Sequence, residues 1–243
     1  MTRCLAISFD IWGTLLDLNG TLRLIAESAS TLYGLENNYV MKQVMRSLEE
    51  AKALRRTAIN MDIKEVLERS REIMARNLGI SRNQVTRVIE YTFETINNYD
   101  VVYPDVPTAL SKLLEMNVYM GVIGNVLFWP SYYTRILLDR TGLSSYMKLV
   151  LFSDEIGYSK PDRGIFLEFS RRSGYPPGRV IHVGDNVVED VGGALSAGFH
   201  ALLINRNIKN RVFIQELKSG VISNFHDLLD IYSDLEKTVC RSN

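Results

Sequence analysis

Cysteine is scarce in this 243-residue sequence, which contains only Cys4 and Cys240. Two cysteines at opposite ends of a chain have neither the number nor the spacing of a disulfide framework or a zinc site. A reducing compartment fits this usage, and we expect a cytoplasmic protein. The segment before Asp10 has one arginine and a short apolar run. Such a segment is too short for a signal peptide or a membrane span.

An excess of charge of either sign is also lacking, because 28 Lys and Arg residues balance 28 Asp and Glu residues. Without a net charge there is no long-range field to attract nucleic acid or anionic lipid. We therefore expect neither as a partner. The chain is expected to be a monomer or a homodimer. Hydrophobic residues make up 46% of the chain, which is typical of a folded globular protein and excludes disorder.

One long stretch, residues 21–100, is poor in helix breakers. It contains no proline, although the chain has six, and its only glycines are Gly34 and Gly79. Its apolar residues recur at the spacing of amphipathic helices in three runs, residues 22–32, 63–74 and 85–96. The two glycines stand where C-terminal helix caps are expected. Ser81 and Gln84 predict a capping box at the start of the last helix.

The rest of the chain alternates short apolar runs with helical patterns. Runs suited to buried parallel strands cover residues 5–9, 118–123, 149–152, 180–183 and 201–204. Helical patterns cover residues 108–114, 132–138, 164–169 and 187–197. This alternation predicts a Rossmann-like, doubly wound parallel α/β sheet. Because one strand precedes the helical stretch, residues 17–100 are expected to form a helical domain inserted into an α/β core made of residues 1–16 and 101–243.

Polar residues follow four of the expected strands. Ligands of such sheets bind beyond the carboxyl ends of the strands, so chemistry is expected there. The residues are Asp10, Trp12, Gly13 and Thr14, then Gly124 and Asn125, then Lys160, and finally Asp185, Asn186 and Asp190. Three carboxylates and one ammonium sum to −2, which is costly unless a cation neutralises the cluster. Oxygen ligands of this kind suit Mg²⁺, which shares its coordination shell with phosphate.

The order and spacing of these segments resemble the haloacid dehalogenase (HAD) superfamily, in the form with a helical (C1-type) cap inserted after the first strand. The likeness covers nearly the whole chain. It implies that Asp10 is a nucleophile that forms a covalent aspartyl intermediate. It implies that Lys160 stabilises this nucleophile and the negative charge of the substrate. Asp185 would complete a Mg²⁺ site with Asp10 and the backbone carbonyl of Trp12.

The resemblance gives supporting roles to the remaining motif residues. Asn186 and Asp190 would lie outside the direct metal ligands, with Asp190 orienting Lys160 or a metal-bound water. The implied substrate contacts are Trp12, Thr14, Gly124, Asn125 and Lys160.

Two positions depart from the phosphatase pattern of the family. Trp12 stands where phosphatases usually have a second Asp, a general acid and base of a kind that contributes roughly 10²–10⁴-fold to a rate. Hydrolysis of alkyl phosphates is therefore expected to be slow, and aryl or acyl phosphates should suffer least. Gly124 stands where the family usually has Ser or Thr. Backbone amides at Gly124 and Asn125, or the Asn125 side chain, would then replace that hydroxyl.

Three functions remain open at this point. An aromatic residue at position 12 is typical of the dehalogenase branch, in which Asp10 would displace halide from a 2-haloacid without a metal. The Asp185, Asn186 and Asp190 pattern favours phosphate, because a phosphate dianion approaching a site of charge −2 needs Mg²⁺. We therefore expect a Mg²⁺-dependent phosphatase acting on a small phosphorylated metabolite. The alternatives are a 2-haloacid dehalogenase and a weakly active or inactive binding protein.

Several other polar or aromatic residues have a structural interpretation. His182 lies inside an expected strand and is interpreted as a satisfied core histidine. Arg55 and Arg56 are expected on a solvated helix face, with contact to a substrate anion as the alternative. The aromatic residues between positions 128 and 133 either line the substrate pocket or pack the helix that follows.

Overall fold

The computed structural model describes residues 3–58, 61–97 and 101–240. The chain divides into two compact units, one of Met1–Leu16, Val102–Asn125 and Gly142–Asn243 and one of Asp17–Val101 and Val126–Thr141. The expected domain boundary at Asp100 lies outside the described residues. Residues 126–141, which the sequence placed in the α/β core, group with the helical unit. The role of that unit as a cap domain stays a prediction.

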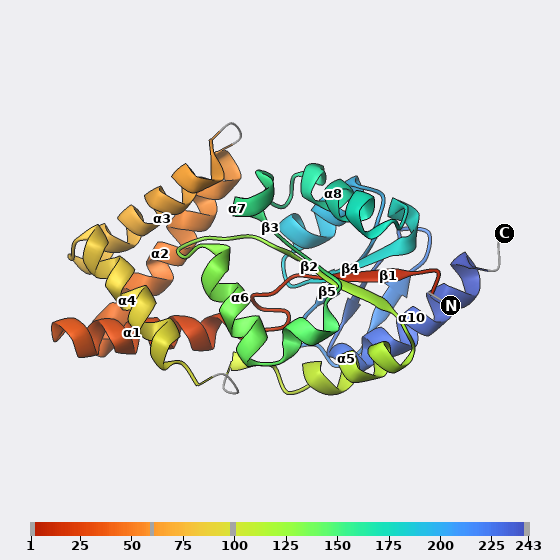
Figure 1. Cartoon of the computed structure of the whole chain (residues 1–243), viewed down its shortest axis with the longest axis horizontal. Helices are drawn as coiled ribbons and strands as arrows, with labels where there is room; N and C mark the ends of the chain where they lie inside the picture. Colours follow the sequence, from red (N-terminus) through yellow and green to blue (C-terminus); the bar gives the residue numbers. More distant parts are fainter. Residues whose placement is uncertain (1–2, 59–60, 98–100, 241–243) are drawn as a thin grey trace. The chain divides into compact units, whose positions relative to one another are not determined.

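The first unit is built on a seven-stranded sheet in the order β3-β2-β1-β4-β5-β7-β6 (Figure 1). The strands are β1 (Ala6–Phe9), β2 (Tyr119–Gly124), β3 (Leu149–Phe152), β4 (Val180–Gly184), β5 (His200–Ile204), β6 (Val212–Ile214) and β7 (Ser219–Ile222). All neighbouring strands are parallel except the antiparallel pair β6 and β7. The doubly wound parallel sheet is thus confirmed. The hairpin of β6 and β7 extends it at one edge and was not expected.

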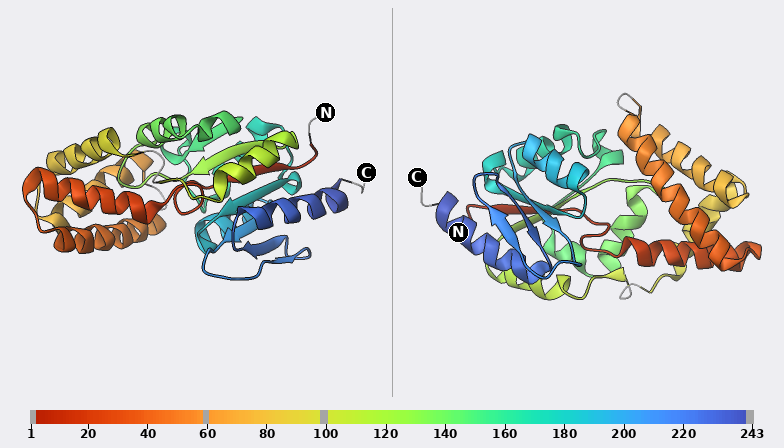
Figure 2. Two further views of the ribbon diagram at one scale, coloured as in Figure 1. Left: turned by 90° about the horizontal axis from the view of Figure 1, so that it is seen from below. Right: turned by 180° about the vertical axis from the view of Figure 1, so that it is seen from behind.

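Helices cover both faces of this sheet. They are α5 (Val106–Glu115), α7 (Ser153–Ile156), α8 (Arg163–Ser173), α9 (Gly193–Ser196) and α10 (Phe225–Val239), with 3₁₀ turns η2 (Leu143–Tyr146) and η3 (Pro177–Arg179) and a π-helical turn η4 (Val187–Gly192). In Figure 1, α8 lies above the sheet and α5 and α10 lie below it. Figure 2 shows the same arrangement from two further sides. The pattern over residues 187–197 therefore corresponds to η4 followed by α9.

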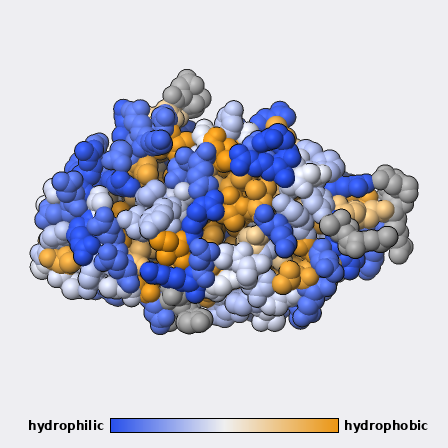
Figure 3. All heavy atoms as spheres, in the orientation of Figure 1, coloured by the Kyte–Doolittle hydropathy of each residue, from blue (hydrophilic) through white to orange (hydrophobic). Residues whose placement is uncertain are grey.

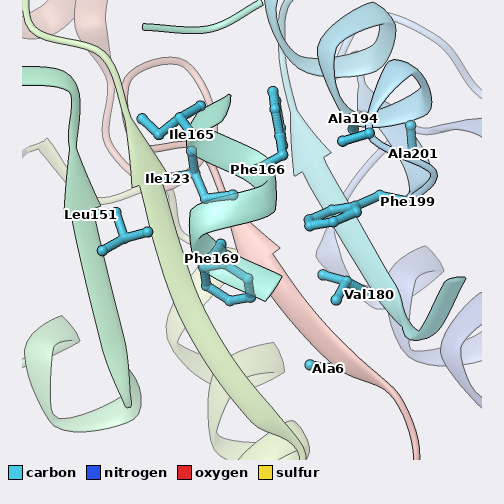
Figure 4. Close-up of a cluster of buried hydrophobic side chains, with 11 residues drawn as sticks. Ala6, Ile123, Leu151, Ile165, Phe166, Phe169, Val180, Ala194, Phe199 and Ala201 are labelled. Atoms are coloured by element: carbon cyan, nitrogen blue, oxygen red, sulfur yellow. The ribbon is translucent and has the colours of Figure 1, made fainter. Parts of the chain in front are cut away.

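The two faces of β1 contact different helices, because side chains alternate along a strand. On one face, Ala6 belongs to a buried apolar cluster with Phe166 and Phe169 of α8 (Figure 4). On the other face, the ring of Phe9 stacks on Phe225 of α10 at a centroid distance of 5.6 Å. Burial on both faces holds the end of β1 between two packed layers, and Asp10 follows directly.

The helical unit contains α1 (Leu18–Tyr33), α2 (Asn37–Thr57), α3 (Ile63–Leu78), α4 (Arg82–Thr95) and α6 (Ser131–Arg140). Helices α1 and α3 each pack against both α2 and α4. Their outward faces are rich in hydrophilic residues, which predominate on the side of the molecule shown in Figure 3. The three predicted helical runs correspond to α1, α3 and α4. Helix α2 buries few apolar residues in a polar sequence, which explains why it was missed.

The expected helix caps are confirmed. Gly34 and Gly79 end α1 and α3 with φ angles of 66° and 70°, a left-handed conformation that glycine adopts without strain. The Ser81 hydroxyl accepts a hydrogen bond from the backbone N–H of Gln84, whose side chain accepts one from the Ser81 N–H. This is the predicted capping box at the start of α4.

Two arginines tie the segment after β2 to the helical unit. Arg55 donates to the carbonyl of Val126 at 3.3 Å, and Arg71 donates to the carbonyl of Phe128 at 3.0 Å. The ring of Trp129 packs edge-on against Phe93 of α4 at a centroid distance of 5.3 Å. The aromatic residues after β2 therefore contribute to packing, and the expectation of a purely solvated Arg55 is wrong.

The two cysteines form a disulfide, contrary to the sequence-based expectation. Cys4 lies just before β1 and Cys240 just after α10, with their Cα atoms 6.2 Å apart at a sequence separation of 236. An ion pair between Arg3 and Glu236, with 2.8 Å between nitrogen and oxygen, joins the same two segments of the chain. The argument for a reducing compartment rested on the lack of a disulfide, so this pairing removes its support. Among the helices of the described residues, none has the length and apolar character needed to cross a membrane.

We predict that Cys240→Ser lowers the free energy of unfolding by about 2–5 kcal/mol, because the disulfide closes a very long loop and restricts the unfolded chain. Urea denaturation without reductant measures this loss. Adding a reductant to the wild-type protein should lower its denaturation midpoint to that of the variant and leave the variant unchanged. A wild-type midpoint insensitive to reductant would contradict the prediction.

Candidate active site

The carboxyl ends of β1, β2 and β4 lie side by side. Phe9 at the end of β1 is in register with Val122 of β2 and Val183 of β4. The backbone N–H of Asp10 donates to the carbonyl of Val183 at 2.8 Å, which fixes the first residue beyond β1. This register brings the polar segments after these strands to one edge of the sheet, as predicted.

Lys160 is the centre of the site. Its ammonium nitrogen donates to Asp10 Oδ1 at 2.5 Å and to Asp190 Oδ1 at 2.6 Å. The lysine is only 2% exposed. Burial lowers the pKa of the Lys160 ammonium, but the charges and hydrogen bonds of the two carboxylates outweigh burial and raise that pKa above its ordinary value. Lys160 is therefore a permanent cation between two acidic side chains.

Asp10 is a buried carboxyl whose pKa is raised by burial and lowered by Lys160. Burial is the largest influence and raises its pKa to about 7, with further upward contributions from Asp190 and Asp185 and an opposing one from Lys160. The hydroxyl of Thr14 donates to Asp10 Oδ2 at 3.3 Å. A cation placed beside Asp10 would favour its ionised form.

Asp190 has the opposite character. Burial raises its pKa, but Lys160 and His182 outweigh burial and hold that pKa well below the ordinary range. Its Oδ1 lies 3.2 Å from Nε2 of His182. Its Oδ2 accepts from the backbone N–H of Asn186 at 2.9 Å. Asp190 is therefore an anion bonded through both oxygens and in contact with Lys160, and its expected role in orienting Lys160 stays a prediction.

His182 is a satisfied core histidine, as expected, but its partner is a site residue. Burial is the main cause that lowers its pKa, so the ring is neutral near pH 7. Its Nδ1 lies 2.9 Å from the hydroxyl of Ser8. The arrangement is satisfied when Ser8 donates to Nδ1 and Nε2–H donates to Asp190. The sequence analysis missed the contacts that join Ser8, His182 and Asp190. The polar residue Ser8 at an inward position of β1 was the signal that could have predicted them.

The Asn125 side chain holds the backbone of Lys160. Its Oδ1 accepts from the Lys160 N–H at 2.9 Å, and its Nδ2 donates to the Lys160 carbonyl at 3.0 Å and to Glu189 Oε2 at 3.3 Å. The carboxamide oxygen and nitrogen of Asn125 are thus both hydrogen-bonded within the protein. Substrate binding by Asn125 stays a prediction. The buried Glu189 was not singled out from sequence.

Two glycines let the backbone approach other site residues. Gly13 has a φ angle of +89°, and a Cβ there would lie 2.2 Å from Asp185 Oδ2. A Cβ at Gly124 would lie 2.8 Å from the ring of Phe152. The buried Phe152 therefore occupies the space that a Ser or Thr side chain would need, which explains the glycine found in place of a hydroxyl residue.

The carboxylates of the site fit a hard divalent cation. Asp10, Asp185 and Asp190 each present an oxygen within 4.8 Å of the others. Buried Asp10 and exposed Asp185 are the carboxylates expected to ligate the metal, while the two oxygens of Asp190 already accept from Lys160 and the Asn186 N–H. Carboxylate oxygens with room for water and phosphate suit Mg²⁺. The expected carbonyl ligand at Trp12, a half-buried residue, stays a prediction.

Asn186 supports the loop that carries Asp190. Its side-chain oxygen accepts from the backbone N–H groups of Val188 and Glu189, each at 3.0 Å, and so caps the π-helical turn η4. This contact is compatible with the expected role of Asn186 outside the direct metal ligands, which stays a prediction.

Comparison with known proteins gives relatives of more than one activity. A glyceraldehyde 3-phosphate phosphatase from Methanopyrus kandleri is 36% identical over 104 residues, 43% of this chain and 43% of that protein. The chain thus aligns with less than half the length of this curated relative. The magnesium-bound HAD hydrolase YfnB of Bacillus subtilis has a TM-score of 0.75 at 17% identity, over 95% of this chain and 99% of that one.

A 2-haloacid dehalogenase from Pseudomonas syringae shares the fold as well, with a TM-score of 0.62 at 21% identity over 96% of this chain and 99% of that one. The structural likenesses show the fold alone. The family profile described as haloacid dehalogenase-like hydrolase matches residues 4–198, which include Asp10, Lys160 and Asp190. With this match over most of its length, the chain belongs to the haloacid dehalogenase-like hydrolases.

Proposed function

We propose that this protein is a Mg²⁺-dependent phosphatase that acts on a small phosphorylated metabolite through an aspartyl-phosphate on Asp10. The carrying observation is the acidic cluster: three aspartates each present an oxygen within 4.8 Å of the others, and Lys160 pairs with two of them, Asp10 and Asp190. A dianionic phosphate needs further positive charge to approach such a site. The named activity of the Methanopyrus kandleri relative agrees with this choice.

Asp10 and Asp185 would hold the metal, which when bound supplies positive charge for the phosphate oxygens and for ionised Asp10. A carboxylate oxygen of Asp10 then bonds to phosphorus as the bond from phosphorus to the leaving oxygen breaks. Lys160 stabilises the negative charge on Asp10 and on the transferring group. Attack of water on the aspartyl-phosphate releases inorganic phosphate and restores the Asp10 carboxylate.

The leaving group has to depart without a protonated carboxyl at position 12. The side chain there is Trp12, which has no acidic proton to give. A substrate with a poorly basic leaving oxygen, such as an acyl or aryl phosphate, loses that oxygen as an anion with little need for a general acid. These substrates are therefore the ones we expect to turn over fastest.

A 2-haloacid dehalogenase is the second candidate, because Trp12 places an aromatic ring directly beyond the nucleophile. The same Asp10 would displace halide from carbon, and no metal would be needed. The exposed Asp185 disfavours this function, since a further carboxylate beside Asp10 adds negative charge where an anionic haloacid would bind. A binding protein with little turnover is the third candidate. The cytoplasmic location also stays a prediction.

A substrate panel separates these functions. Wild-type protein is assayed with acetyl phosphate, p-nitrophenyl phosphate and 2-chloropropionate, each with Mg²⁺ and with EDTA. We expect phosphate release that needs Mg²⁺ and is abolished in Asp10→Asn, which lacks the nucleophilic oxygen. Asp234→Asn, at an exposed aspartate paired with Lys237, is the matched control and should keep full activity. EDTA-resistant halide release would refute the phosphatase, and no turnover at all would favour the binding protein.

Mg²⁺ affinity is predicted to rise with pH. Metal binding needs ionised Asp10, and burial raises the pKa of Asp10 to about 7. Below pH 7, Asp10 is mostly protonated and has to lose its proton before the metal binds. Calorimetric titration with Mg²⁺ should therefore show affinity that falls about tenfold per pH unit below pH 7 and levels off above about pH 8. Asp10→Asn should bind weakly and without this pH dependence. A flat profile in the wild type would contradict the predicted link.

Trp12→Asp is predicted to raise the rate for alkyl phosphates. The introduced carboxyl would protonate the leaving oxygen, so kcat for glycerol phosphate should increase by roughly 10²-fold or more. The rate for acetyl phosphate should change little, since its leaving group needs no proton. Trp12→Phe removes the indole without adding an acid and serves as the control. Equal rates for the Asp and Phe variants on glycerol phosphate would rule out the missing acid as the limiting feature.

A further inference from the structure

Arg206 lies beyond the end of β5 and donates hydrogen bonds to the turn that follows β1, residues 11–16. Its Nη1 donates to the carbonyl of Gly13 at 3.0 Å, and its Nη2 donates to the carbonyl of Thr14 at 2.9 Å. Hydrogen bonds from a guanidinium are stronger than those between neutral groups, and the planar fork fits two adjacent acceptors. We propose that Arg206 is a positioning residue, which sets the place of this turn and through it the places of Asp10 and Asp185.

The turn touches both of these acidic residues. Gly13 lies so close to Asp185 that a Cβ on it would be 2.2 Å from the carboxylate oxygen. Thr14 donates its hydroxyl hydrogen to Asp10 Oδ2 at 3.3 Å. Arg206 therefore binds the carbonyls of the same two residues whose other atoms contact the carboxylates. A shift of this turn would move both contacts together.

The turn is closed by its own hydrogen bonds and is joined to Tyr103, whose N–H donates to the carbonyl of Leu15 at 3.2 Å. Inside it, the N–H groups of Thr14, Leu15 and Leu16 all point to the carbonyl of Ile11, at 3.2, 2.8 and 2.9 Å. These bonds fold the turn on itself and leave the carbonyls of Gly13 and Thr14 to an outside donor. Arg206 is that donor. Its loss would leave two adjacent carbonyls without their charged partner.

Arg206 is itself held in a fixed orientation. Its guanidinium lies over the ring of Tyr103, with the central carbon 3.6 Å from the ring centroid. Its Nη2 also donates to Asp105 Oδ1 at 3.2 Å, while Asp105 Oδ2 accepts from the N–H of Phe225 at 2.9 Å. Stacking and ion pairing restrict the side chain before any ligand arrives. A lysine offers neither the planar stack nor two parallel donors.

The effect of Arg206 on catalysis rests on the proposed function, but its hold on the turn does not. The test therefore compares wild type, Arg206→Met and Arg206→Lys with Arg211→Met as the matched control. Arg211 is five positions further along the chain and pairs with Asp230 at the surface, away from the turn. Thermal melting checks that each variant is folded, with Arg206→Lys as the milder change.

The first measurement is amide hydrogen exchange of residues 13–16, which needs neither metal nor substrate. Arg206→Met should raise exchange there at least tenfold relative to β4, and Arg211→Met should leave it unchanged. Exchange unchanged in Arg206→Met, or raised equally throughout the sheet, would overturn the positioning role. Because this result needs no activity, it stands even if the wild type proves to have no phosphatase activity.

The second measurement is Mg²⁺ affinity by calorimetry, together with kcat on acetyl phosphate. Residues that orient metal ligands typically change affinity or activity by about 10- to 100-fold, and we expect both in Arg206→Met, with a smaller change in KM. Addition of guanidinium ion to Arg206→Gly should restore part of kcat. Normal Mg²⁺ affinity and kcat in a folded Arg206→Met would overturn the inference, whereas wild-type protein without either property would refute the proposed function instead.

Discussion

The site depends on one buried cation held between two buried anions. Removing an ammonium from water costs several kcal/mol, and the cost is recovered only when the charge is well paired and bonded. Lys160 meets this condition through Asp10 and Asp190, while Asn125 fixes its backbone from both sides. Several neighbouring residues contact Lys160 or one of its two carboxylate partners. His182 and Asn186 are examples, since each bonds to Asp190 rather than to a ligand.

Lys160 contacts two aspartates, Asp10 and Asp190, whose environments differ. Asp190 has Lys160, His182 and a backbone N–H as partners, so it stays ionised and saturated. Asp10 shares Lys160 but has only a long hydrogen bond from Thr14 in addition, and burial then raises its pKa to about 7. Carboxyls whose environments separate their pKa values commonly have different roles in one reaction. Here one is a fixed support, and the other has the spare capacity that a nucleophile and metal ligand need.

Periodic patterns predicted most of the fold. The first five strands and helices α1, α3 and α4 were identified because burial imposes a clear repeat on their residues. Helix α2 and the β6–β7 hairpin were missed, since α2 is largely polar and Val212 and Ile214 of β6 are exposed, so burial imposes little pattern on either. The Cys4–Cys240 disulfide left no signal, because its partners have a sequence separation of 236.

The candidate site was predictable in its residues but not in its contacts. Strand ends give the positions of Asp10, Lys160 and Asp190, because parallel strands place their carboxyl ends at one edge. Sequence does not report which groups reach each other across that edge. The carboxamide of Asn125 and the ring of Phe152 are two such cases. Each could be assigned only once the fold placed them beside Lys160 and Gly124.

The two departures from the phosphatase pattern have different physical meanings. The glycine at position 124 is accommodated by the core, since Phe152 fills the space of the missing side chain. No comparable replacement is evident for the acid missing at Trp12. Glu189 is a buried carboxyl of the site, but it already accepts from Asn125. On the proposed function, the described residues would provide a nucleophile, a cation and carboxylates for a metal, and none of them is identified as a proton donor to the leaving oxygen. Such a site would select its substrate by the stability of the departing anion.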